Sequence, residues 1–339
     1  MAFGNRVLTT TQDELLPKVV DTILNSNVFA TRMLGRAKQW KGETLKQPIK
    51  VSKNSTGQSF SGFDTFSTSA TNNRVNLSYN PKFYQITVAL PLDELSVNQT
   101  DSKVLDLAAV ELSSGSQDMA DDVGTLFHSD GTGNSGKDFL GLGAIVDDGG
   151  DVATIGGQSR STYTTLQSTD TASSGVISLA KLSTLHSDVS SGSQKPTLGL
   201  CTEAVWNFIE SLIAPQERII KDEPMIRKGI VGGSGFTAIF YRGVPIVADE
   251  KTTSQRFYWL NEDWIEFFAL PVALTEPIKF RMQDIKGNDY SSVKGLGFSW
   301  SGWIKPPNSA SVVGHIYLGG ELVTWNPKRH GRLTGITST

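Results

Sequence analysis

The feature that most constrains this chain is a ribbon pattern between Glu43 and Leu92. Apolar and polar residues alternate there in three runs, which is the period of a β-strand with one covered face. Between the first two runs lies Ser52–Asn73, which is rich in Ser, Thr, Gly and Asn. Its hydrophobic content is mainly three aromatic residues, namely Phe60, Phe63 and Phe66. Compact domains seldom hold so long a stretch without a core, and isolated hairpins are marginally stable. The pattern therefore predicts a two-stranded projection that needs another surface to lie on.

Two helical patterns flank this ribbon. Apolar residues recur every four positions over Thr11–Arg36, which predicts an amphipathic arm. Thr11 and Glu14 form a capping box, while Pro17 predicts a kink or a helix that begins there. A second pattern over Ser102–Ser129 predicts a helix of roughly 40 Å, at about 1.5 Å per residue, with one apolar side.

From about Val176 onward the chain alternates between helical and strand patterns, which predicts an α+β fold. Helices are expected over Leu179–Val189 and Thr202–Ile213. Strands are expected at Thr197–Cys201, Phe236–Tyr241, Val244–Ala248, Phe257–Leu260 and Ile265–Leu270, with further alternation over Tyr290–Ile316.

Composition excludes several classes of protein. Cys201 is the one cysteine, which rules out an internal disulfide framework, and the four histidines lack zinc-site spacing. The formal charge of −3 argues against electrostatic wrapping of nucleic acid by the whole chain. No apolar run approaches the roughly 20 residues of a membrane span, so no membrane partner is expected. The N-terminus shows no apolar signal core, so we expect folding in the cytosol.

The glycine-rich turn over Gly131–Lys137 is the strongest candidate for a ligand site. Its glycines match a dinucleotide-binding loop and most of a phosphate-binding loop. Both motifs require a strand that leads into the loop and a helix that follows it. Here a helix precedes the turn, and Asp138 stands where a magnesium-binding Ser or Thr is needed. We therefore expect a glycine-terminated helix end, with a nucleotide-binding enzyme as an unfavoured alternative.

Three further groups of residues are candidate sites. Asp147, Asp148 and Asp151 could form a calcium loop, but their spacing matches no defined motif and favours a solvated turn. His186 stands among serines on a short helix, without a nucleophile elbow, which favours a surface position. The basic tail Lys328–Arg332 is predicted to contact either a phosphate backbone or a neighbouring acidic surface. No catalytic, cofactor or metal residue is predicted, and the chain is not expected to be an enzyme.

The order of these parts resembles the major capsid protein of tailed bacteriophages. The segments that carry the resemblance are the arm Leu15–Arg36, the ribbon Glu43–Leu92 ending in Phe83–Pro91, the helix end Leu126–Asn134 with Gly141-Leu142, and the stretches Tyr241–Asp249 and Tyr258–Asn261. The likeness lies in the order of the elements and covers nearly the whole chain. Bacterial encapsulin shells, which enclose cargo enzymes, share this order of elements.

The resemblance implies five regions. These are an N-terminal arm over 1–40, an extended β-hairpin loop over 41–92, a peripheral domain with a long spine helix over 93–174, an axial domain over 175–276, and return strands with a C-terminal tail over 277–339. In this family the arm and loop lie across adjacent subunits. A lysine of the loop is a crosslinking residue in some relatives, and Lys53 is the nearest counterpart, although an ordinary solvated lysine is the favoured interpretation.

The function that the resemblance implies is a head protein that assembles as hexamers and pentamers. Many copies would close into an icosahedral shell around double-stranded DNA, without sequence-specific binding. The implied partners are further copies, a scaffolding protein, a portal protein and decoration proteins, although the short N-terminal region favours a separate scaffolding protein or none. The implied location is the virion, after assembly in the host cytoplasm. The alternatives are an encapsulin-like compartment and the nucleotide-binding enzyme.

Overall fold

The computed structural model describes residues 27–98, 107–217, 238–270, 276–277, 280–283, 289–293 and 298–337. The first part of the predicted arm, with Thr11, Glu14 and Pro17, lies outside the described residues. The described part of the arm is the helix α2 (Val28–Gly35). Its apolar side is buried, because Phe29 packs edge-on against Phe127 of the longest helix, with ring centroids 6.4 Å apart.

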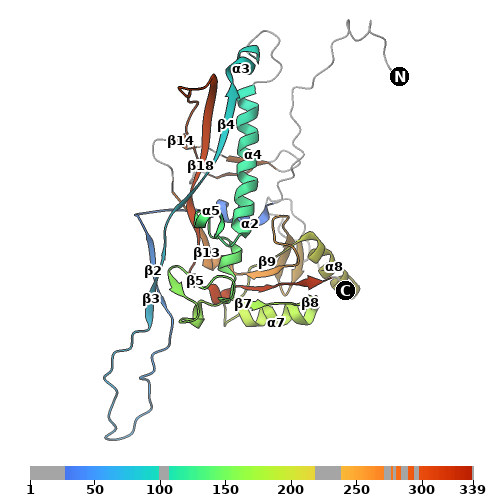
Figure 1. The fold of residues 1–339 in the computed structure, drawn as a ribbon. Helices are drawn as coiled ribbons and strands as arrows, with labels where there is room; N and C mark the ends of the chain where they lie inside the picture. The colour runs from blue at the N-terminus through green and yellow to red at the C-terminus, as the bar shows by residue number, and fades with distance from the viewer. Residues whose placement is uncertain are drawn as a thin grey trace.

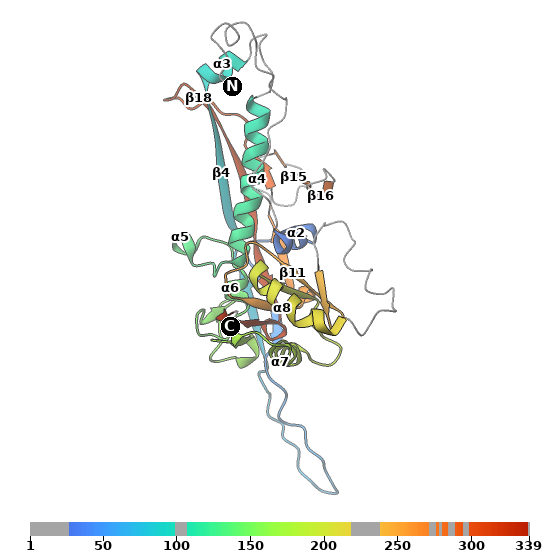
Figure 2. The same cartoon turned by 90° about the vertical axis from the view of Figure 1, so that its right-hand side faces the viewer.

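The elongated half of the molecule is a sheet covered by one long helix. The sheet order is β1 (Lys38–Gln39), β13 (Ile265–Ala269), β18 (Ser311–Thr324), β17 (Phe298–Trp300) and β14 (Glu276–Pro277), with β4 (Lys82–Pro91) also paired to β18. The helix α4 (Leu107–His128) runs along β4 and β18 (Figures 1 and 2). The predicted long helix is confirmed over its described residues, and its apolar side is buried through Met119, Val123 and Phe127.

The predicted ribbon is shorter than 41–92. Only β2 (Leu45–Lys50) and β3 (Arg74–Tyr79) pair with one another, in antiparallel register from Leu45↔Tyr79 to Lys50↔Arg74. The third alternating run became β4, which pairs over its whole length with β18. The reason is that β18 offers a partner of 14 residues, and its own alternation matches that of β4. The C-terminal part of the expected loop therefore belongs to the sheet of the body.

The second half is a six-stranded sheet packed against two helices. Its order is β10 (Ala238–Tyr241), β11 (Val244–Ala248), β9 (Leu198–Cys201), β12 (Phe257–Leu260), β19 (Gly331–Leu333) and β7 (Thr169–Thr171). Its apolar core is shared with α7 (Leu179–Val189) and α8 (Glu203–Glu217). This sheet takes β7 and β19 from outside 175–276, whereas β13, within that range, joins the first sheet. The sheet boundaries therefore do not follow the expected domain ranges.

Short elements complete the described fold. They are α3 (Leu92–Asn98), α5 (Gly133–Gly136), α6 (Leu142–Ile145), the hairpins β5 (Thr154–Ile155)–β6 (Gln158–Ser159) and β15 (Phe280–Gln283)–β16 (Asp289–Val293), the pair β8 (Gly175–Val176)–β20 (Ile336–Thr337), and the 3₁₀ turns η1 (Thr164–Leu166), η3 (Glu262–Trp264) and η4 (Pro327–Arg329). Among the described helices, none combines the length and the apolarity that crossing a membrane requires.

Candidate assembly surface

The base of the ribbon is fixed to the body. Leu77 is fully buried, and Tyr79 is nearly so; they join a cluster that includes Trp40, Leu166 and Val323. The Tyr79 hydroxyl donates a hydrogen bond of 2.8 Å to the carbonyl oxygen of Thr324. Burial is the main cause that raises the pKa of this hydroxyl, so it stays a donor at neutral pH. The inward face of β2 and β3 therefore holds the ribbon at a set position on the body.

The distal part of the ribbon touches almost nothing in its own chain. Every residue from 57 to 72 is exposed, and no strand forms beyond Lys50 and before Arg74. Phe63 is 105% exposed, while Phe60 and Phe66 contact each other with ring centroids 5.2 Å apart. Figure 2 shows this segment extending beyond the body, at the end opposite to α3. Burying each ring fully is worth about 1.5–3 kcal/mol, most of which this chain alone does not gain.

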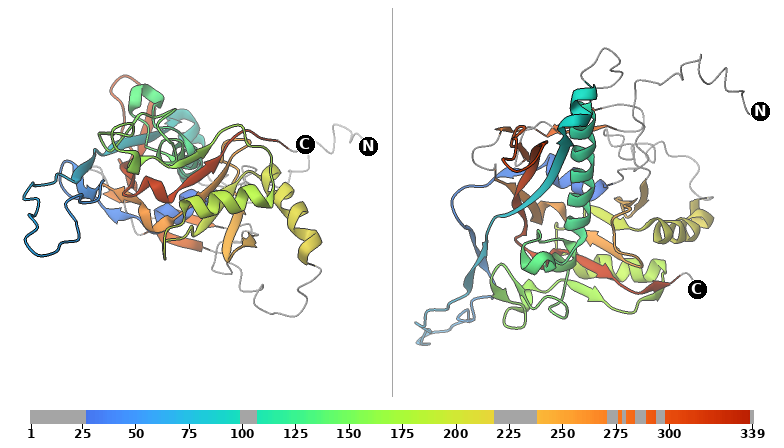
Figure 3. Two further views of the ribbon diagram at one scale, coloured as in Figure 1. Left: turned by 90° about the horizontal axis from the view of Figure 1, so that it is seen from below. Right: turned by 45° about the horizontal axis from the view of Figure 1, so that its top comes forward.

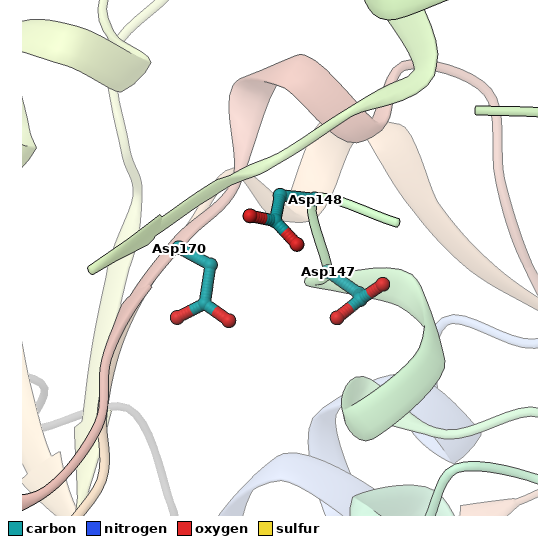
Figure 4. A group of neighbouring side chains, drawn as sticks. All are labelled: Asp147, Asp148 and Asp170. Carbon is teal, nitrogen blue, oxygen red and sulfur yellow. The ribbon is translucent and has the colours of Figure 1, made fainter. Parts of the chain in front are cut away.

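An acidic cluster of one buried, one half-buried and one exposed aspartate lies where the sequence indicated a solvated turn. Asp147, Asp148 and Asp170 are neighbours (Figure 4), and each has one carboxylate oxygen within 4.8 Å of one oxygen of the other two. Asp147 is fully buried, so the expectation of a solvated turn is wrong for it. The predicted third member, Asp151, is 68% exposed, and Asp170 of β7 takes its place in the cluster.

Arg332 supplies the charge that this cluster needs. Its Nη2 atom lies 2.9 Å from Asp147, 2.8 Å from Asp151 and 2.5 Å from Asp170. Burial by itself lowers the pKa of Arg332, but the hydrogen bond and charge of Asp170 raise it overall, so the guanidinium stays charged. The Arg332 guanidinium thus neutralises two members of the cluster, Asp147 and Asp170, in place of a cation. Arg160, also fully buried, donates from Nη1 to the carbonyl oxygen of Asp147.

The basic tail is consequently not a free cationic segment. Arg332 and His330 are buried, because β19 inserts between β12 and β7. His330 receives the backbone N–H of Asn261 at Nδ1, at 3.3 Å. Burial, with a smaller effect of Arg329, lowers the pKa of His330 to about 3, so the ring is neutral at physiological pH. Within this segment Lys328 is exposed and Arg329 is half-buried, while the remaining residues are buried.

His186 is buried rather than on the surface, which corrects the prediction. Its ring packs edge-on against Trp259 at 5.6 Å, because this side of α7 faces β12. Burial, followed by the charges of Arg242 and Lys195, lowers its pKa. The nearest hydroxyl, of Ser190, donates to the backbone oxygen of His186 at 2.6 Å. In the described residues no carboxylate contacts this histidine, so a hydrolase triad is not assembled there.

The Gly131–Lys137 turn does not have the geometry of a phosphate loop. Its only helix is the single turn α5, in which Asn134 and Ser135 adopt positive φ angles of 49° and 59°. The side chain of Asp138 fills the space beside Gly133, where an added Cβ would lie 2.0 Å from the carboxylate. A carboxylate in this position repels phosphate, and among the described helices none longer than one turn begins at this turn.

Sequence reasoning missed Glu321, a buried acid that joins three segments. It is the one carboxylate within β18 and is 3% exposed. Its Oε1 atom accepts the backbone N–H groups of Leu140, at 2.6 Å, and Leu322, at 3.1 Å, while Lys82 Nζ lies 3.4 Å from Oε2. Burial is the main cause that raises the pKa of Glu321 to about 7. The only signal in the sequence was one acid within an apolar terminal strand.

Solved structures of other proteins have the same fold as this chain. The chain is similar to the subunit of the cyanophage A-1(L) capsid, with a TM-score of 0.76, 13% identity, and 99% of this chain and 100% of that chain covered. It is similar to the capsid of the Myoviridae phage XM1, with a TM-score of 0.60, 12% identity and 99% of both chains covered. The encapsulin complex of Synechococcus elongatus PCC 7942 matches with a TM-score of 0.59, 13% identity, and 100% and 97% coverage. No family model and no curated protein sequence matches the chain.

Proposed function

We propose that this chain, which has the fold of tailed-phage capsid proteins and encapsulins, is a major capsid protein that assembles into a closed shell. Its role is structural and non-catalytic. The shell encloses double-stranded DNA without reading its sequence, and the subunits associate as hexamers and pentamers, since repeated heterologous contacts close into rings. Its location is the virion, after assembly in the host cytoplasm, with scaffolding, portal and decoration proteins as the further partners.

The observation that carries this proposal is the ribbon beyond Lys50. The segment from 57 to 72 is exposed and holds three large aromatic rings, while its base is held rigidly by Leu77 and Tyr79. A rigid base with an unburied apolar tip is stabilised by a second molecule placed at a set geometry. In the proposed shell the ribbon and the arm lie across neighbouring copies, and the sheet that contains β9 and β12 forms the axial domain at the centre of each ring.

Sedimentation and negative-stain electron microscopy of the purified protein test this function. We expect large particles of uniform size, formed by the chain alone or with a scaffolding protein. A subunit that stays monomeric under all of these conditions would contradict the proposal.

An encapsulin-like compartment is the second candidate, because an encapsulin is among the matched structures over the whole chain. The content of purified particles separates the two functions. Particles from infected cells that contain double-stranded DNA support the capsid, whereas particles filled with a cargo enzyme support the compartment. Binding of nucleotides by Gly131–Lys137 is not proposed, because Asp138 occupies that turn.

A further inference from the structure

The helix α2 of the arm begins without a cap of its own. Asn27 stands at the N-cap position, where an asparagine side chain usually accepts a backbone N–H of its own helix. Here that bond is not made, and Asn27 Nδ2 donates instead to the carbonyl oxygen of Ala120 in α4, at 3.2 Å. Gly124 leaves the room for this contact, because a Cβ atom there would lie 2.3 Å from Asn27 Nδ2. The start of α2 is therefore fixed on α4, beside which it lies in the right-hand view of Figure 3.

A buried aspartate from a distant segment supplies the missing cap. Asp249 directly follows β11 and is fully buried. Its Oδ2 atom accepts the backbone N–H of Phe29, at 2.9 Å, and its Oδ1 atom accepts the backbone N–H of Lys251, at 2.9 Å. A carboxylate in this place is favoured by the unpaired N–H groups and the dipole of the helix. The beginning of α2 thus depends on a charge that lies 220 positions further along the chain.

Among the described residues, no Lys or Arg side chain pairs with Asp249. Lys251 is close in sequence, but its Nζ atom lies 2.6 Å from Asp121 of α4. Cys201, whose carbonyl oxygen accepts the N–H of Asp249, brings no charge, because burial above all raises the pKa of its thiol. The remaining group is His128, whose Nε2 atom lies 4.0 Å from Oδ2 of Asp249. Whether Asp249 has a counter-charge therefore depends on the protonation of His128.

The hydrogen bonds of His128 determine which ring nitrogen carries the hydrogen. Nδ1 lies 2.9 Å from the carbonyl oxygen of Gly124, which can only accept, so Nδ1 is the donor. In the neutral ring Nε2 is then an acceptor, and it faces the hydroxyl of Thr252, at 3.4 Å, and the carboxylate of Asp249. A proton added to Nε2 turns it into a donor and places a positive charge beside that carboxylate. The ring is buried and packs edge-on against Phe29 at 5.7 Å, so water screens this pair weakly.

From these contacts we propose that His128 and Asp249 form a proton-operated clamp on the root of the arm. In the protonated state, Nε2 donates to Asp249, and the ion pair holds the carboxylate beneath the first turn of α2. In the neutral state this attraction is absent. The charge of a histidine ordinarily changes between about pH 5 and pH 8. Acidification through this range therefore tightens the hold of α4 and β11 on α2, and a rise in pH loosens it.

The other charged groups around the clamp have partners of their own. On α2, Arg32 forms a bidentate pair with Glu262, at 2.6 and 2.7 Å. On α4, Asp121 is paired with Lys251. Asp130, which follows α4, is exposed, and hydrogen bonds from Thr132 lower its pKa, so it keeps its charge throughout the range. His128 is thus the group at this junction whose charge responds to mild acidification.

Hydrogen–deuterium exchange of the unassembled full chain tests the clamp. The readout is the protection of residues 28–35, corrected for the intrinsic exchange rate at each pH and divided by the protection of the core strand β12. This ratio removes changes in global stability. We expect it to rise about fivefold or more from pH 7.5 to pH 5.5, since a hydrogen bond to a charged group forms. His128→Gln should abolish the rise, whereas the matched control His315→Gln, on β18, should keep it.

A second variant removes the charge that the proton meets. Asp249→Asn leaves His128 free to titrate but takes away the carboxylate, so the rise in protection should disappear there as well. A ratio that stays flat in the wild type, or falls on acidification, overturns the proposal. So does a rise that persists in either variant.

The tautomer gives an independent measurement that needs no substitution. It decides the matter where circular dichroism shows that both variants fail to fold. In nitrogen NMR of the wild type labelled at histidine, the ring that contacts Phe29 should carry its hydrogen on Nδ1 at pH 8 and gain a second proton by pH 5. A ring that is still neutral at pH 5, or that carries its hydrogen on Nε2 at pH 8, excludes the clamp. Neither measurement requires particles, so a failure of the proposed shell function leaves this test unchanged.

Discussion

Replacing Glu321 with glutamine should change how the stability of the subunit depends on pH. The carboxylate is buried beneath Leu140 and accepts two backbone N–H groups, with Lys82 as its only cationic contact among the described residues. A glutamine amide has nearly the same shape, and its oxygen can accept the same two N–H groups. The substitution Glu321→Gln therefore removes the charge and keeps most of the packing.

The size of the effect follows from the pKa of Glu321, which rises from 4.5 to about 7 on folding. At about 1.4 kcal/mol for each pH unit, the ionised form is destabilised in the folded state by about 3 kcal/mol. The folded chain keeps this proton over a range in which the unfolded chain has lost it. The wild type therefore loses stability as the pH rises from 4.5 through 7. Above pH 7.5 the variant should be more stable by up to about 3 kcal/mol, a figure that already includes the attraction of Lys82 for the carboxylate.

Urea unfolding of the unassembled subunit between pH 5 and pH 8 measures this difference. His330 has the opposite effect, because its pKa is lowered and the wild type loses stability as the pH falls below 6.5. That contribution is common to both proteins and cancels in the difference between their curves. The control is Glu94→Gln, which changes an exposed acid of α3. A difference curve that stays flat, or a variant that is less stable than the wild type at pH 8, would refute the reasoning.

Three further predictions concern other parts of the chain. Arg332→Leu removes the buried ion pair of Asp147 and should lower the free energy of unfolding by about 3–5 kcal/mol in urea titrations. Lys328→Leu should change it by less than about 0.5 kcal/mol. Equal stability of the two variants would show that the cluster is not held by Arg332. Deletion of residues 55–72 should leave the circular dichroism spectrum of the body unchanged, since this tip buries almost nothing, but should prevent the assembly of particles. Unfolding of the body in this variant would show that the ribbon is part of the core. Lys137→Ala should not change nucleotide titrations by isothermal calorimetry, and a lost binding signal would restore the enzyme hypothesis.

Local patterns in the sequence determined the elements that define this fold. The alternation at Leu45, Leu77 and Tyr79 predicted the paired strands β2 and β3, and the apolar residues at every fourth position around Met119 and Val123 predicted the long helix α4. Both predictions succeed because the period of an amphipathic element depends on the geometry of its own backbone. The exposed tip also followed from composition, since a segment with only three large apolar residues buries too little surface to fold on its own.

Tertiary structure alone decided which charged residues are buried. Arg332 looked like part of a solvated tail, yet it meets Asp147 across 185 positions of sequence; Glu321 meets Leu140 across 181. The same holds for the strand β4, whose alternation fitted both a longer ribbon and the pairing with β18 that it adopts. The residues next to it in the sequence determine which backbone conformation a residue prefers. Its burial is determined by segments that are distant in the sequence and that strand pairing places beside it. The pKa of a buried group and the identity of its counter-ion follow from that burial.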